Sequence, residues 1–131
     1  MKQGRVVLAD SHQNMMEGIR GLLETVFEVV VMVADETSLL DTVDTVNPDL
    51  VVVDLSLPVS EEMNVARSFS RAKPGMKFLI LSVHDDRTAV DECMASGACG
   101  FVLKRTAADD LLPAVEEVLR GGRYVSASVR T

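Results

Sequence analysis

Four short apolar runs of this 131-residue chain each end on a side chain that could do chemistry. The four side chains are Asp10, Asp54, Ser82 and Lys104, at the ends of residues 5–9, 50–53, 78–81 and 101–103. Runs of this kind read as buried parallel strands, and ligands of open α/β sheets lie outside the carboxyl ends of such strands. The sequence therefore predicts that two carboxylates, a hydroxyl and an ammonium meet at one edge of a sheet.

These groups together favour phosphoryl chemistry assisted by a cation. Two like charges about 4 Å apart cost on the order of 4 kcal/mol at an effective dielectric near 20, and a divalent cation relieves that cost. Mg²⁺ commonly takes one or two carboxylates, and a carboxylate can also accept a phosphoryl group. Asp54 is the better nucleophile candidate, because Lys104 and Ser82 on neighbouring strands could neutralise and hydrogen-bond the new charge.

The elements that must position these residues alternate strictly along the chain. β-branched or apolar runs predict strands over residues 5–9, 27–34, 50–54, 77–82 and 99–104. The stretches between them repeat apolar residues at helical spacing, as in Met15, Ile19 and Leu22 of a helix expected over 12–25. Five βα units with right-handed crossovers predict an α/β fold, a flavodoxin-like (βα)5 doubly wound parallel sheet of strand order 2-1-3-4-5. Asp10 and Asp54 would then face each other at the switch point of the sheet.

Local signals at helix ends refine these bounds. Ser11 is expected to cap the first helix, and the pair Asp85-Asp86 to cap the fourth. Thr106 and Asp109 have capping-box spacing at the start of the last helix. Pro113 either kinks the first turns of that helix, or the helix begins near residue 110, where a proline costs no hydrogen bond.

Composition excludes several function classes. The formal net charge of -7 opposes binding to a phosphate backbone, so this segment alone should not bind DNA. No stretch approaches the roughly 18 to 20 apolar residues of a membrane helix, so we expect a soluble, cytoplasmic protein without membrane contact. Cys93 and Cys99 fit reduced thiols in a reducing compartment.

Residues 1–121 are predicted to form one domain. Residues 122–131 lose the helical pattern after two glycines, and they are predicted to be the start of a linker.

Four segments resemble the receiver domain of two-component response regulators, and the likeness covers almost the whole chain. They are Val7–His12, Pro48–Pro58, Leu81–Asp86 and Gly97–Lys104. The residues of these segments and the ending Gly121–Tyr124 are most similar to the NarL/FixJ (LuxR-type) branch, whose members have a C-terminal helix-turn-helix domain.

The resemblance implies a phosphorylation switch rather than an enzyme. Asp54 would accept a phosphoryl group from a sensor histidine kinase, and Lys104 would pair with the phosphoryl oxygens. Ser82 and Phe101 would be the hydroxyl and aromatic switch positions. Mg²⁺ would be held by Asp10, Asp54 and the backbone carbonyl of Ser56. Phosphorylation would control homodimerisation, through the face of the fourth helix, fifth strand and fifth helix, and a C-terminal DNA-binding domain in transcription regulation.

The chain also departs from the receiver pattern. Receivers usually have two adjacent acids after the first strand, and Ser11 stands at the second. Glu62 stands where a glycine is usual, and Glu61 or Glu62 could instead supply a carboxylate. His12 and His84 lie in loops at the same edge, where two histidines alone predict exposed loop residues rather than a metal site.

Three other functions are compatible with parts of this pattern. The main alternative is a degenerate receiver that acts as a phosphorylation-independent dimerisation or protein-interaction module, as Ser11 and Glu62 suggest. A hydrolase of haloacid dehalogenase type would need an acid two residues after Asp54, where Ser56 stands. A flavodoxin would need a phosphate-binding loop after the first strand, which residues 11–14 do not resemble.

Overall fold

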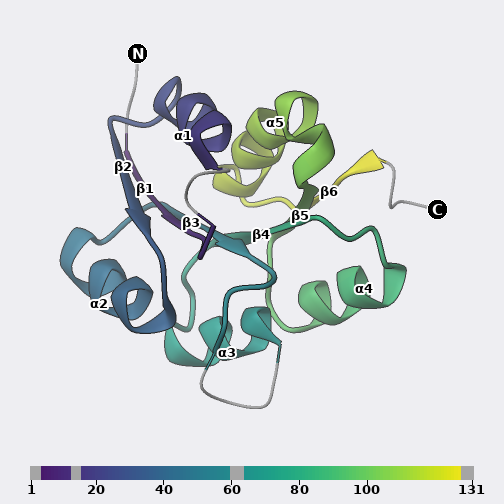
Figure 1. Ribbon diagram of the computed structural model, residues 1–131, viewed down its shortest axis with the longest axis horizontal. Coiled ribbons are helices and arrows are strands. Elements are labelled where there is room, and N and C mark those ends of the chain that lie inside the picture. Colours follow the sequence, from purple (N-terminus) through teal and green to yellow (C-terminus); the bar gives the residue numbers. More distant parts are fainter. Residues whose placement is uncertain (1–3, 13–15, 60–63, 128–131) are drawn as a thin grey trace.

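The computed structural model describes residues 4–12, 16–59 and 64–127. Its strands form one parallel sheet of order β2-β1-β3-β4-β5-β6. The strands are β1 (Arg5–Ala9), β2 (Val29–Val33), β3 (Leu50–Asp54), β4 (Phe78–Ser82), β5 (Gly100–Leu103) and β6 (Tyr124–Val125). The predicted fold class and strand order are confirmed, and a sixth strand extends the sheet at its β5 edge (Figure 1).

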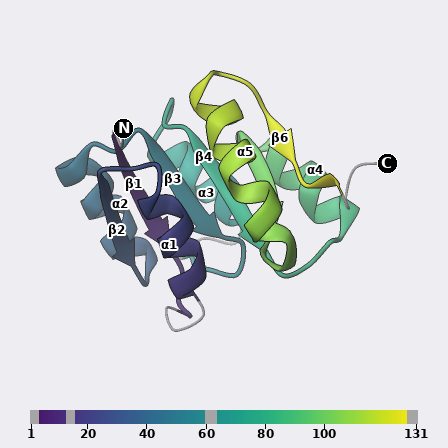
Figure 2. The ribbon, with the colours of Figure 1, turned by 90° about the horizontal axis from the view of Figure 1, so that it is seen from above.

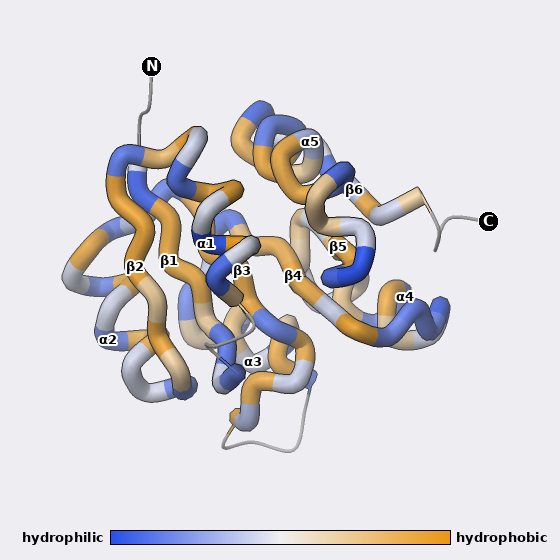
Figure 3. The backbone as a smooth tube through the Cα atoms, turned by 45° about the horizontal axis from the view of Figure 1, so that its top comes forward, coloured by the Kyte–Doolittle hydropathy of each residue, from blue (hydrophilic) through white to orange (hydrophobic). Residues whose placement is uncertain are grey.

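Five helices cover the two faces of this sheet. They are α1 (Glu17–Glu24), α2 (Glu36–Val46), α3 (Val65–Ala72), α4 (Arg87–Ala95) and α5 (Ala107–Leu119). Helices α1 and α5 lie together on one face, and α2, α3 and α4 lie on the other (Figures 1 and 2). Both faces of the central strands are therefore buried, which is why those strands read as continuous apolar runs in the sequence (Figure 3).

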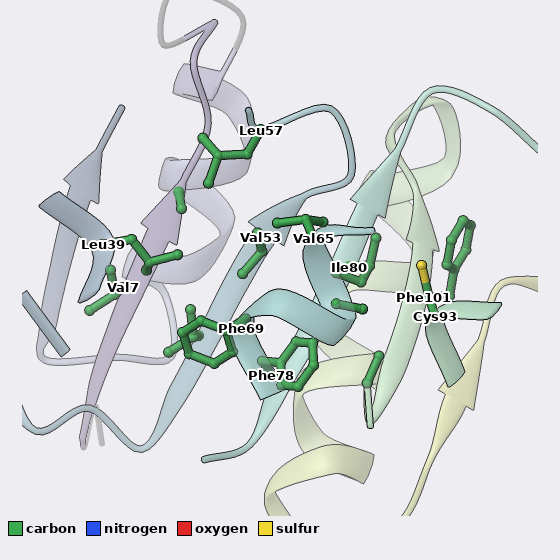
Figure 4. Close-up of a cluster of buried hydrophobic side chains, with 14 of the residues drawn as sticks. Val7, Leu39, Val53, Leu57, Val65, Phe69, Phe78, Ile80, Cys93 and Phe101 are labelled. Atoms are coloured by element: carbon green, nitrogen blue, oxygen red, sulfur yellow. The ribbon is translucent and has the colours of Figure 1, made fainter. Parts of the chain in front are cut away.

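Alternate residues of each strand enter separate hydrophobic cores. Val7 and Val53 belong to the core under α2, α3 and α4, whereas Leu8 and Val52 belong to the core under α1 and α5. In the first core the rings of Phe69 and Phe78 meet edge to face, with their centroids 5.0 Å apart (Figure 4). Because successive side chains point to opposite faces, each strand is packed on both sides of the sheet, and this packing fixes the positions of the strand ends.

At two helix starts the capping differs from the prediction. Ser11 is not the cap of α1, because α1 begins at Glu17 after Met16, which has no side-chain capping bond. Residues 13–15 lie outside the described part of the chain. Thr106 is the N-cap residue of α5, as its position in the sequence predicts, but it makes no capping bond, and its hydroxyl donates instead to Oδ2 of Asp110 at 2.6 Å. A 3-10 turn over Lys104–Thr106 precedes α5 and supplies the change of direction there.

Other helix ends agree with the sequence. Asn47 ends α2 in a left-handed conformation, with φ of 52°. Asp86 caps α4 by accepting a hydrogen bond from the Thr88 N–H at 2.9 Å, whereas Asp85 pairs with Arg105. Because α5 begins at Ala107, Pro113 lies inside the helix, and the alternative start near residue 110 is excluded.

The segment after α5 adds a short parallel strand to the sheet. The Tyr124 N–H donates to the Cys99 carbonyl at 3.1 Å, and the Ser126 N–H donates to the Phe101 carbonyl at 2.9 Å. Strand β6 thus covers the edge of β5, within residues that the sequence predicted as the start of a linker. Within the described ranges, every helix is too short or too polar to cross a membrane.

Candidate functional site

The four polar strand ends meet at the carboxyl edge of the sheet, as the sequence predicts. Asp10 directly follows β1, Asp54 and Ser82 are the last residues of β3 and β4, and Lys104 directly follows β5. The exposed fractions of Asp10, Asp54 and Ser82 are only 1%, 2% and 1%. Charged and polar side chains this deeply buried need partners, because desolvation without compensation is costly.

Lys104 is the common partner of both carboxylates. Its Nζ lies 2.8 Å from Oδ2 of Asp10 and 3.4 Å from Oδ2 of Asp54. Strands β1 and β3 are neighbours, so their acids are adjacent, and the lysine reaches them from β5 across the end of β4. Two carboxylates and one ammonium leave the group with a formal charge of -1, which is attractive to a cation.

The second oxygen of Asp10 faces the loop after β1. Oδ1 accepts a hydrogen bond from the His12 backbone N–H at 2.6 Å, and Nδ1 of the His12 ring lies 3.6 Å from it. Burial raises the pKa of Asp10, but the hydrogen bonds from Lys104 and the His12 N–H and the lysine charge outweigh it. The pKa of Asp10 is therefore lowered from 3.8, and this carboxyl stays ionised at neutral pH.

Asp54 is held by Ser56, two residues later. The Ser56 N–H donates to Oδ1 at 3.2 Å, and the Ser56 hydroxyl donates to Oδ2 at 2.8 Å. The resemblance implies a role only for the backbone carbonyl of Ser56, so this contact of its hydroxyl is an addition to the predicted site. Its signal in the sequence is the hydroxyl-bearing residue two positions after the strand-end acid.

Ser82 shares the edge but has its own partner. Its hydroxyl donates to the His84 carbonyl and accepts from the His84 N–H, both at 2.9 Å. Phe101, the other predicted switch residue, is fully buried on β5, in the same core as Val90 and Cys93 of α4 (Figure 4). In this conformation the described hydrogen bonds of Ser82 therefore go to the loop after β4.

His12 is the residue that the sequence interpretation underrated. Its side chain is 61% exposed, as expected for a loop residue, yet it also joins a group of potential metal ligands. One ligand atom each of Asp10, His12 and Asp54 lies within 4.8 Å of the others. His84 is not part of this group, and Glu61 and Glu62 lie outside the described residues. The donor atoms present therefore fit a divalent cation.

Comparisons with known proteins agree on one family. The family described as response regulator receiver domain matches residues 6–116. The chain is 35% identical over 127 residues to the transcriptional regulatory protein DegU of Brevibacillus brevis, covering 95% of the chain and 54% of DegU. It is 33% identical over 130 residues to the oxygen regulatory protein NreC of Staphylococcus haemolyticus, covering 97% of the chain and 60% of NreC.

Solved structures show the same likeness. A LuxR-family two-component response regulator from an Aurantimonas species superposes with a TM-score of 0.85 at 28% identity, over 98% of this chain and 93% of that one. The RcsB response regulator of Salmonella typhimurium gives a TM-score of 0.87 at 25% identity, over 98% of this chain and 66% of RcsB. The chain thus spans between about half and two thirds of DegU, NreC and RcsB.

Proposed function

Because the chain belongs to the response regulator receiver domain family, in its NarL/FixJ (LuxR-type) branch, we propose that Asp54 accepts a phosphoryl group from a sensor histidine kinase. The main support is the position of Lys104, whose Nζ lies 3.4 Å from Oδ2 of the buried Asp54 carboxylate. A fixed ammonium at this distance stabilises the negative charge that arrives with the phosphoryl group.

In the reaction, a carboxylate oxygen of Asp54 attacks phosphorus, and the P–N bond to the kinase histidine breaks. The product is an acyl phosphate, and the kinase imidazole leaves with the bonding electrons. Asp10 and Asp54 are the residues that would hold Mg²⁺, with the backbone carbonyl of Ser56 as a further ligand. The cation supplies positive charge to the phosphoryl oxygens. Ser56 orients the acceptor, because its N–H and hydroxyl each bind one of the two carboxylate oxygens and so restrict rotation of the carboxylate.

The acyl phosphate would then reorganise the same edge. Lys104 shifts its pairing from Asp10 toward the phosphoryl oxygens, since a doubly charged group attracts it more strongly than one carboxylate. The Ser82 hydroxyl leaves its two bonds to His84 and donates to the phosphoryl group. Phe101 on β5 follows this movement and changes the packing against α4.

Phosphorylation would be communicated to other proteins through a change in the domain's surface. The face of α4, β5 and α5 changes shape, and this change controls homodimerisation and a C-terminal DNA-binding domain in transcription regulation. DNA is contacted only through the further domain, since the chain itself has a net charge of -7. Asp54 would keep the phosphoryl group as a signal, so the domain would not act as an enzyme on a substrate.

Intact-mass analysis tests the phosphorylation directly. The purified domain is incubated with Mg²⁺ and acetyl phosphate at a concentration that labels a standard receiver. We expect the mass to increase by one phosphoryl group, and Asp54→Asn to show no increase. Asp35→Asn is the matched control, because Asp35 is an exposed carboxylate that caps α2 and should leave labelling intact. An unchanged mass of the unaltered protein contradicts the proposal.

Ser11 favours one second candidate, a degenerate receiver that dimerises or binds proteins without phosphorylation. A serine beside Asp10 leaves the cation with one carboxylate fewer, which lowers the attraction for Mg²⁺. Under this function the oligomeric state, measured by light scattering, is the same with and without acetyl phosphate. A switch instead forms the dimer only after the donor is added.

A further inference from the structure

We propose that this site is a mixed carboxylate and imidazole metal site, in which His12 is a ligand beside Asp10 and Asp54 and shifts selectivity toward transition-metal dications. The proposal rests on the proposed function only in taking Asp54 as part of the metal site. It adds a residue and a class of ion that phosphoryl transfer itself does not require.

The ligand atoms are already close to coordination distance. A ring nitrogen of His12 and carboxylate oxygens of Asp10 and Asp54 lie within 4.8 Å of one another. The Nδ1 of His12 is 3.6 Å from Oδ1 of Asp10. Two ligands on a tetrahedral ion with bonds of about 2.1 Å are separated by roughly 3.4 Å, so this pair needs almost no movement to share an ion.

The surrounding contacts leave the required oxygen available. Lys104 takes Oδ2 of Asp10, on the side of the carboxylate that faces β5. Oδ1 points toward the loop, where the His12 backbone N–H donates to it at 2.6 Å. The backbone bond thus holds the His12 main chain against Asp10, while the ring, 61% exposed, is accessible to an ion from solvent.

The charges of the group predict the selectivity. Asp10 and Asp54 together with Lys104 leave a formal charge of -1, which is weak attraction for a strongly hydrated Mg²⁺. A neutral imidazole adds no charge, so it does little for Mg²⁺, which prefers oxygen ligands. Imidazole suits the later transition metals, whose affinities for nitrogen ligands are intrinsically higher. His12 should therefore raise the affinity for Co²⁺ and Zn²⁺ selectively.

Metal titration of the unphosphorylated protein tests this inference. Untagged protein is titrated with Co²⁺ and separately with Mg²⁺ by calorimetry, and the Co²⁺ complex is followed by its visible absorption. We expect His12→Ala to weaken Co²⁺ binding at least tenfold, a loss that even supporting residues of metal sites can cause. Mg²⁺ binding should change less than about twofold, because its oxygen ligands remain. The alanine keeps the backbone N–H, so the bond to Asp10 survives the substitution.

The chain offers a matched control in its only other histidine. His84 is exposed at the same edge but lies outside the ligand group, so His84→Ala should leave both affinities and the Co²⁺ spectrum unchanged. His12→Asp should reverse the selectivity, raising Mg²⁺ affinity and lowering that of Co²⁺. Equal Co²⁺ affinity in the unaltered protein and His12→Ala overturns the inference.

Failure here is separable from failure of the proposed function. The titration contains no phosphoryl donor, so it reports metal binding alone. If Asp54 is labelled by acetyl phosphate while His12→Ala binds Co²⁺ normally, the receiver function stands and this inference is wrong. If His12 governs Co²⁺ binding and Asp54 is never labelled, the metal site stands and the phosphorylation proposal is wrong.

Discussion

The ammonium of Lys104 donates to Oδ2 of Asp10 at 2.8 Å, although the two residues are 94 positions apart in the chain. This ion pair joins the ends of β1 and β5 over the intervening strands. The lysine is nearer to Asp10 than to Asp54, whose Oδ2 lies 3.4 Å away. In this conformation Asp10, and not the proposed phosphoryl acceptor, is therefore the stronger partner of the lysine. Phosphorylation of Asp54 would reverse that preference.

Replacing Lys104 by Met should destabilise the fold. The substitution leaves Asp10 and Asp54 buried without their counter-charge, and breaking a buried pair from one side costs about 3 kcal/mol or more. We expect that decrease in the free energy of unfolding, measured by urea denaturation at pH 7. Asp10→Asn in the Lys104→Met background should restore part of the stability. If both variants unfold at the urea midpoint of the unaltered protein, the pair contributes nothing.

Acid should weaken the fold through Asp10. Its pKa is lowered from 3.8 in the folded state, so at pH values just below 3.8 the unfolded chain binds a proton that the folded chain does not. The stabilisation is therefore fully present above pH 3.8 and is lost as the pH falls through the lower folded pKa. Urea unfolding between pH 6 and pH 3 should show a steeper decline for the unaltered protein than for Asp10→Asn. If the two proteins lose stability equally as the pH falls, the acid sensitivity comes from titratable groups other than Asp10.

The sheet and the convergence of its strand ends are predictable because they follow from periodic burial. Strands β1 and β3 match the predicted bounds of 5–9 and 50–54, since both faces of a central parallel strand are apolar and the run stops where burial stops. Once the order of strands is known, the meeting of Asp10 and Asp54 is a geometric consequence. No knowledge of loops is needed for that step.

What the sequence could not predict depends on loops and on single contacts. Strand β6 has only two residues, both half-buried, in a polar segment without any period. Ser11 does not mark the start of α1, and the sequence alone could not show this, because a serine near a helical pattern gives the same signal whether or not it lies at the first turn. The nearness of His12 to Asp10 depends on how the backbone turns after β1. The only available signal was the two-residue spacing.

Ser126 should contribute measurably to stability although it lies beyond the predicted domain boundary. It is fully buried, and its Oγ accepts a hydrogen bond from the Leu103 N–H at 3.0 Å. Ser126→Ala leaves that buried N–H without its acceptor, which should lower the free energy of unfolding by about 1–3 kcal/mol. A chain ending at Gly121 should lose more, because it also lacks β6. If the shortened chain is as stable as the full one in urea denaturation, residues 122–127 act only as a linker.

The two cysteines should differ in reactivity. Both are free thiols, but Cys93 is buried in α4 whereas Cys99 is partly exposed. Burial, with a smaller effect of the Glu92 charge, raises the pKa of Cys93 to about 11, so almost no reactive thiolate exists at pH 8. Iodoacetamide should label the native protein once, and Cys99→Ser should remain unlabelled over the same time, as read by intact mass. Labelling of Cys99→Ser at the rate of a free thiol would show that α4 opens readily.

Ser11→Asp should separate the two candidate functions. Ser11 is exposed beside Asp10, so an aspartate there adds a charge at the cation site without disturbing the core. If the unaltered site is too weak for Mg²⁺, the substitution should raise Mg²⁺ affinity and the labelling of Asp54 together, because each added carboxylate ligand strengthens binding of a hard cation. If the site is already competent, both quantities should change little.

Calorimetry with Mg²⁺ measures the affinity for the cation, and intact-mass analysis after acetyl phosphate measures the labelling of Asp54. Thr45→Asp, in the exposed last turn of α2 at the opposite end of the sheet, controls for the charge itself. A gain in Ser11→Asp alone favours the degenerate receiver, and unchanged labelling favours the phosphorylation switch.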